Sequence, residues 1–142
     1  MAEAPTIQVD IVSAEGEIYS GPALELVAPA SQGELGIHPR HAPLLTLLKA
    51  GEVRLTSPDS EVHYFFVGGG ALEVQPRKIT VLADTALRAR DLDEAAAVAA
   101  KQRAEEALKD KSGKVTEAEA MAELVRATEQ LKMLARLRKL KG

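Results

Sequence analysis

Proline is confined to the first part of this chain. All seven prolines lie before residue 90, and residues 91–142 contain none. Because proline fixes φ and removes a backbone donor, it suits turns and sheet edges and disrupts helix interiors. The alanine-rich remainder favours helix. We therefore predict an α+β protein in two domains, an N-terminal antiparallel β-sandwich over residues 1–88 and a C-terminal antiparallel hairpin of two helices over residues 89–142.

Short segments of alternating apolar and polar residues predict the sandwich. Ile7, Val9 and Ile11 fall on one face of a segment with the period of two that is typical of a half-buried strand. Further strands are expected at 17–19, 23–27, 44–48, 52–56, 62–67, 71–74 and 78–82, separated by turn-forming residues. No helical pattern interrupts the series, so a sandwich or barrel is favoured over a parallel βαβ sheet.

The segment 33–45 reads Gly-Glu-Leu-Gly-Ile-His-Pro-Arg-His-Ala-Pro-Leu-Leu. Two glycines permit positive φ and two prolines restrict their own φ and that of the preceding residue. We predict a kinked loop here, not a helix or an interior strand. Its apolar residues Leu35, Ile37, Leu44 and Leu45 are expected to be buried against the core.

Three consecutive glycines at 68–70 are expected to end a strand. They lack the Lys and Ser/Thr of a phosphate-binding loop, and no helical pattern follows them. A bulge or a close approach of two backbones is the physical interpretation.

The helical part contains two helix-start signals. Asp91 and Glu94 resemble a capping box that opens a helix to about Lys109, and Thr116 with Glu119 forms a second one. The second helix is expected to reach Leu140 with an apolar stripe at Met121, Leu124, Leu131 and Leu134, widened by Val125 and Leu137. Alanine on the facing surfaces buries little area, so we expect a weakly held, mobile hairpin.

Composition excludes several functions. The chain has no Cys, no Trp and only 3% aromatic residues, with a net charge of −3. Thiolate metal sites, stacking platforms for bases and a basic nucleic-acid surface are therefore not expected. We expect no signal peptide, because residues 1–5 lack a basic flank and an apolar core, and no membrane-spanning segment, because no apolar run is long enough.

Candidate chemistry is sparse. Glu34, His38 and His41 share one loop, but Pro39 separates the histidines and no helix aligns them for a metal. No nucleophile–base arrangement or spaced carboxylate pair stands out. We expect no catalytic residue, metal or cofactor, and interpret the chain as a non-enzyme.

Charge differs between the halves. Residues 1–90 carry a net −4, whereas residues 91–142 carry +1. No acid follows Glu129, while the bases there are Lys132, Arg136, Arg138, Lys139 and Lys141. Cations near a helix C-terminus complement its dipole, and the excess favours an acidic partner.

The segment 33–45 resembles the signature loop of the epsilon subunit of bacterial F-type ATP synthases. The likeness extends to residues 67–74 (Val-Gly-Gly-Gly-Ala-Leu-Glu-Val), to 80–86 (Thr-Val-Leu-Ala-Asp-Thr-Ala) and to parts of the first helix at 92–95 and 104–106. It covers roughly residues 6–137. It departs at Arg40, where the family pattern has Gly, so the local loop geometry is expected to differ.

The resemblance implies a rotor subunit at the cytoplasmic face of the bacterial inner membrane. The sandwich would hold the gamma shaft and rest on the c-ring, and the hairpin would fold against the sandwich or extend toward the alpha and beta subunits and block ATP hydrolysis. It implies that Glu34 faces the c-ring and that Ser13, His41 and Thr46 face the gamma subunit. Arg126, Lys132, Arg136 and Arg138 would meet acidic segments of the beta and gamma subunits.

Some family members bind ATP through a Leu/Ile-Asp-x-x-Arg-Ala motif. Here Leu92 and Asp93 are present, but Ala96 stands at the arginine position, so the guanidinium that would hold phosphate is missing. The alternative function is a free-standing sandwich that binds a small ligand or sugar, with the hairpin as a dimerisation element. The scarcity of aromatic residues argues against it.

Overall fold

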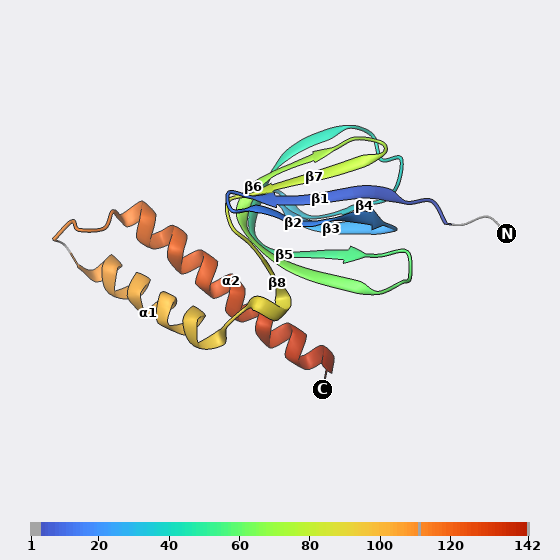
Figure 1. The fold of residues 1–142 in the computed structure, drawn as a ribbon. Coiled ribbons are helices and arrows are strands. Elements are labelled where there is room, and N and C mark those ends of the chain that lie inside the picture. The colour runs from blue at the N-terminus through green and yellow to red at the C-terminus, as the bar shows by residue number, and fades with distance from the viewer. Residues whose placement is uncertain (1–3, 111, 142) are drawn as a thin grey trace. The chain divides into compact units, whose positions relative to one another are not determined.

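The computed structural model describes residues 4–110 and 112–141, with the side chain of Lys141 excepted. The chain divides into two compact units, Met1–Ala89 and Arg90–Gly142. The first unit is all strand and the second is helical (Figure 1). The predicted α+β class, a sandwich followed by two helices, is confirmed.

The described part of the first unit forms a bent sheet that folds over itself. Its strands, in spatial order, are β2 (Gly16–Ala23), β1 (Ile7–Ser13), β7 (Lys78–Ala83), β6 (Val62–Val74), β5 (Leu44–Thr56), β3 (Glu25–Ala30) and β4 (Gly33–Ile37), and β8 (Ala86–Arg88) pairs with β6. The long strands β5 and β6 pair with each other along their whole length. One part of β6 also pairs with β7 and another part pairs with β8. The long strands β5 and β6 therefore belong to both layers of the sandwich.

The core is aliphatic and follows the period-two pattern. Ile7, Val9 and Ile11 are almost completely buried, as their alternation predicts, and Leu26, Leu55, Leu72 and Ile79 from other strands join the same cluster. The ring of Phe65 lies in this core with Tyr19 edge-on at 5.5 Å between ring centroids. Burying a valine, leucine, isoleucine or phenylalanine side chain contributes about 1.5–3 kcal/mol to the free energy of folding, so the unit has a substantial core of its own.

One pairing was not predicted. β1 runs antiparallel to β2 but parallel to β7, with Val9 opposite Ile79 and Ile11 opposite Val81. Alternation along a strand reports which face is buried and carries no information on the direction of its neighbour. The antiparallel sandwich therefore contains one parallel pair between segments far apart in sequence.

The segment 33–45 was predicted as a loop, which is wrong for its first part. Residues 33–37 form the edge strand β4, where the outer side of the strand needs no partner, and the loop is confined to residues 38–43. Ile37 is fully buried and Leu35 and Leu44 are half-buried, but Leu45 is 73% exposed. The prediction that Leu45 is buried is therefore wrong, because it alternates with the inward-facing Leu44.

The expected breaks at 49–51 and 68–70 are also wrong, because β5 and β6 continue through them. The physical interpretation of the glycines is correct. Gly69 and Gly70 have φ of 111° and 135°, and a Cβ at Gly70 would lie 2.0 Å from the carbonyl oxygen of Leu82 in β7. Glycine at this position lets the backbones of β6 and β7 approach each other where the sheet bends.

The second unit is an antiparallel helix pair, α1 (Glu94–Lys109) and α2 (Glu117–Lys141), preceded by a 3₁₀ turn at Ala89–Asp91 (Figure 1). The predicted cap of the first helix at Asp91 is wrong by two residues. Asp93 is the N-cap, and its Oδ1 accepts from the amides of Ala95 at 2.9 Å and Ala96 at 3.2 Å. The second predicted cap is correct, since Thr116 Oγ1 accepts from Glu119 N at 3.1 Å.

Alanines supply most of the buried positions of the helix pair. Ala97 and Ala104 of α1 and Ala120 and Ala127 of α2 are buried. The two alanines of each helix are seven residues apart and therefore lie on one face of that helix. The predicted leucine stripe of α2 is only half-buried, Met121 and Val125 are exposed, and Met133 is the large buried side chain. The small alanine side chains explain why the leucine stripe is only half-buried. They allow the two helix axes to approach each other along a narrow contact, and the longer side chains lie at the margin of that contact.

We expect Gly70→Ala to destabilise the first unit much more than Gly33→Ala. Both glycines have nearly the same φ, 135° and 133°, but a Cβ at Gly33 has no atom within 4 Å. The control should lose about 1–3 kcal/mol for backbone strain alone, and Gly70→Ala should lose at least about 2 kcal/mol more for the clash. Urea unfolding of the two variants measures the difference, and equal losses would contradict the close-approach interpretation.

Candidate functional site

The outer face of the sandwich carries an apolar row. Leu47 of β5, Ala71 of β6, Leu82 of β7 and Val12 of β1 are register partners across four neighbouring strands. Leu47 is 67% exposed and Leu82 is 51% exposed, and Leu45 adds another exposed leucine beside the row. We call Leu45, Leu47, Ala71, Leu82 and Val12 the apolar row. A contiguous exposed apolar surface of this kind is typical of a protein interface.

The sequence contained the signal for this surface. In the run Leu44 to Leu48, alternate residues must lie on opposite faces of a strand. Because Leu48 is buried, Leu45 and Leu47 are outward-facing. From the sequence we expect Leu45 to be buried and make no prediction for Leu47, so the row is not identified there.

The predicted partner-contact residues are spread over the first unit. Ser13 ends β1 and Thr46 lies in β5, and β7 and β6 lie between these strands, which is about 14 Å of sheet. Thr46 is opposite Leu72 and is half-buried, on the side of β5 away from Leu45 and Leu47. His41 lies in the loop before β5, where its Nδ1 is 2.7 Å from the carbonyl oxygen of Ala42. The structure does not gather these three residues into one cluster.

Glu34 lies on the edge strand β4 and is paired. Its two carboxylate oxygens accept from Arg54, at 3.0 Å from Nη2 and 3.3 Å from Nη1, in a two-pronged ion pair. His38 pairs instead with Glu25 at 2.7 Å. Among the described residues, no group of three potential ligands is close enough to hold a metal ion, and Glu34, His38 and His41 do not converge.

The bases of α2 are distributed around the helix. Arg138 Nη2 lies 2.6 Å from Glu94 Oε2 at the start of α1, and Lys132 pairs with Glu129 on its own helix at 3.4 Å. Lys132 and Arg136 are four residues apart and share one side, whereas Arg138 points to another. Arg126 is half-buried. Arg103 of α1 also pairs with Glu123 of α2 at 3.3 Å, a second ion pair between the described parts of the two helices.

The remnant of the nucleotide motif has a structural role. Asp93 uses its carboxylate to cap α1, and Ala96 presents only its amide to that carboxylate. A carboxylate that already accepts two amide hydrogen bonds at a helix N-terminus is satisfied and favourably placed in the helix dipole. The capping role therefore accounts for Asp93 without a ligand.

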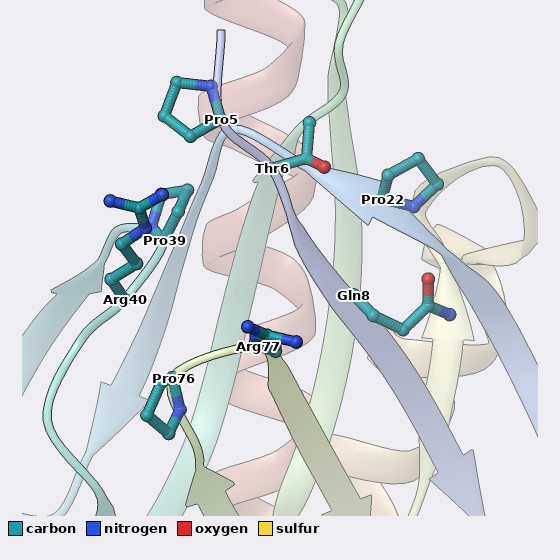
Figure 2. A pocket seen from close by; sticks show the side chains of 8 residues that line it. All are labelled: Pro5, Thr6, Gln8, Pro22, Pro39, Arg40, Pro76 and Arg77. Carbon is teal, nitrogen blue, oxygen red and sulfur yellow. The ribbon is translucent and has the colours of Figure 1, made fainter.

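A hollow of about 770 Å³ lies in the first unit (Figure 2). It lies where the start of β1, the end of β2, the loop 38–43 and the turn between β6 and β7 meet, and Arg40 and Arg77 border it. Arg40 has a left-handed φ of 67°. This backbone costs a non-glycine residue about 1–2 kcal/mol, and it is the conformation that the glycine of the family pattern would adopt without strain.

Asp10 lies near this hollow and is part of a local network. It accepts from Gln8 Nε2 at 3.0 Å and from Ser20 Oγ at 2.8 Å, and it pairs with Lys78 at 3.0 Å. The hydrogen bond from Gln8, with those from Lys78 and Ser20, holds the pKa of Asp10 below its ordinary value. Its negative charge is therefore kept and neutralised locally.

Comparison with known proteins matches the chain along nearly its whole length. Residues 6–89 match the family described as ATP synthase, Delta/Epsilon chain, beta-sandwich domain, and residues 90–135 match the long alpha-helix domain of the same chain. The ATP synthase epsilon chain of Nitrosococcus oceani is 61% identical over 139 residues, covering 98% of this chain and 99% of the relative. That of Halorhodospira halophila is 56% identical over 135 residues, covering 94% and 96%.

Solved structures share the fold at low identity. A chain of the Euglena gracilis mitochondrial ATP synthase matches with a TM-score of 0.73 at 16% identity, covering 96% of this chain and 84% of that one. A chain of the Tetrahymena thermophila central stalk and c-ring structure matches with a TM-score of 0.62 at 14% identity, covering 94% and 99%.

The chain is thus a two-part, sandwich-and-hairpin subunit of the kind found in rotary ATP synthases. It belongs to the epsilon-chain family of bacterial F-type ATP synthases, as the resemblance of residues 33–45 predicts. It is a non-catalytic subunit of that complex. Neither described helix is both long and apolar enough to serve as a membrane span.

We expect the pair between Arg138 and Glu94 to hold the helices together measurably. Breaking it with Glu94→Gln or Arg138→Gln should lower hairpin stability by roughly 0.2–1 kcal/mol and speed amide exchange in α1 and α2 by up to about fivefold. Exchange in β6 should not change.

A double-mutant cycle separates the pair from the loss of either charge alone. The double variant should lose less than the sum of the single variants. Additive losses would contradict a direct interaction between the two side chains.

Proposed function

We propose that this chain is a rotor subunit that couples the gamma shaft to the c-ring and restrains ATP hydrolysis through its helices. The observation that carries the proposal is the contrast between the two units. The sandwich unit has a large aliphatic core of its own and an exposed apolar row, whereas the described part of the hairpin buries mainly alanines and includes the exposed ion pairs Arg103–Glu123 and Arg138–Glu94. One unit suits a fixed attachment and the other suits movement.

The apolar row supports the attachment to the gamma subunit. The exposed leucines of β5 and β7, with Ala71 of β6 between them, form a rigid surface, and burying one of them against a partner contributes about 1.5–3 kcal/mol. We place Ser13 and His41 at the margins of this contact and Thr46 in the strand that carries its leucines. Glu34 lies on the edge strand β4, outside the strands that carry the apolar row. We assign it to the c-ring, where its ion pair with Arg54 would orient its carboxylate.

The helix pair supports a regulatory role. Two of its α2 bases, Lys132 and Arg138, are held by weak, solvent-exposed pairs, so an acidic surface can compete for them at small cost. We assign Arg126, Lys132, Arg136 and Arg138 to acidic segments of the beta and gamma subunits when the helices extend, with the alpha subunits nearby. Two arrangements that differ by a few kcal/mol allow such a switch. The complex would place this chain at the cytoplasmic face of the bacterial inner membrane.

Removal of residues 91–142 should raise ATP hydrolysis by the purified complex severalfold. The sandwich contains its own core, so the truncated chain should still bind the gamma subunit as tightly as the full chain. Hydrolysis is measured with complexes rebuilt from either form. Equal rates would argue against an inhibitory hairpin, and loss of gamma binding would argue against the sandwich as the attachment.

Leu47→Glu should weaken binding to the gamma subunit by about tenfold or more, because a charge replaces an apolar side chain in the proposed contact. Val62→Glu is the matched control, since Val62 is an exposed apolar residue of the sandwich outside the row. Both variants should fold, and the affinities are measured by titration against isolated gamma subunit. Equal weakening by both substitutions would remove the apolar row from the interface.

A further inference from the structure

The hollow bordered by Arg40 and Arg77 has rigid walls. Pro5, Pro22, Pro39 and Pro76 line it, from four separate segments of the chain. Figure 2 shows the two arginines on the facing segments, Arg40 beside Pro39 and Arg77 beside Pro76. Because proline fixes its own φ, these segments lose little conformational freedom when a ligand enters.

A backbone hydrogen bond sets the spacing of the two arginines. The amide of Arg40 donates to the carbonyl oxygen of Pro76 at 2.9 Å, which ties the loop 38–43 to the turn that carries Arg77. The amide of Gln8 in turn donates to the carbonyl oxygen of Arg77 at 3.1 Å, so β1 anchors the same turn. The two guanidinium groups are therefore presented by a fixed backbone.

Neither arginine has an acidic partner among the described residues. The nearby carboxylates are used elsewhere, Asp10 by Lys78 at 3.0 Å and Glu25 by His38 at 2.7 Å. The hollow thus has two uncompensated positive charges on its border. Arg40 also keeps a left-handed backbone that glycine would adopt without strain, and strain of this kind is found at functional positions.

We propose that this hollow binds a phosphate-type oxyanion between Arg40 and Arg77. Guanidinium groups present paired donors that match phosphate oxygens, and their charge strengthens each hydrogen bond. The hydroxyl of Thr6 lines the same hollow and can add a neutral donor. The oxyanion is either free phosphate or the headgroup of an anionic phospholipid.

The test titrates the full chain with inorganic phosphate and follows the arginine side-chain Nε–H signals by NMR. Sodium chloride at matched ionic strength is the reference for general screening. A second arm measures sedimentation with phosphatidylcholine vesicles that contain or lack phosphatidylglycerol. Saturable shifts with phosphate identify free phosphate as the ligand, and sedimentation only with phosphatidylglycerol identifies the lipid headgroup.

Three variants decide the site. Arg40→Gly removes the guanidinium and suits the left-handed backbone, and Arg77→Gln removes the charge while keeping most of the side chain. Each should weaken binding in the responding arm by about fivefold or more. Lys49→Gln removes an exposed cation of β5 that does not line the hollow, and it should change binding by less than about twofold.

Three results would overturn the proposal. The first is that neither phosphate nor phosphatidylglycerol binds. The second is that chloride produces the same shifts as phosphate. The third is that Lys49→Gln weakens binding as much as the two arginine variants. None of these results bears on the gamma contact or on hydrolysis, which are measured separately.

Discussion

The architecture of the first unit depends on the contact between the backbones of β6 and β7 at Gly70. A side chain there would overlap the carbonyl of Leu82, so the strands can meet only because glycine has none. This contact lies where β6 changes from pairing with β8 to pairing with β7. The long strands thereby belong to both layers, and the layers enclose a single aliphatic core. A fold that bends through continuous strands keeps most backbone hydrogen bonds through the bend.

The two units are stabilised by different interactions. The sandwich buries branched aliphatic side chains and Phe65, each contributing about 1.5–3 kcal/mol. The helix pair relies on buried alanines, two caps and exposed ion pairs, each contributing about 1 kcal/mol or less. Local opening follows such differences, since free energies of opening range from near zero to the global value within one protein. This contrast gives the proposed regulatory movement a physical basis that does not require the sandwich to change.

Much of the fold was predictable because period-two alternation records burial directly. Ile7, Val9 and Ile11 illustrate this, and the motif at 33–45 identified the family. Sequence reasoning failed where geometry is set by distant partners. The parallel neighbour of β1 and the continuity of β6 through its glycines each depend on which strand lies alongside. Asp91 and Asp93 have equivalent capping chemistry, so the sequence alone could not choose between them. The hollow at Arg40 unites four segments that no local pattern connects.

The place of β1 between β2 and β7 has a consequence for biosynthesis. Gln8 pairs with Lys78, so one of the earliest strands to leave the ribosome waits for nearly the last strand of its unit. The edge of β1 that faces β7 has no backbone partner during this interval, and contacts of such long sequence separation form slowly. The helix pair has the opposite character, since its contacts are local and can form soon after synthesis. The first unit is therefore the part of the nascent chain with the greater need for protection from aggregation.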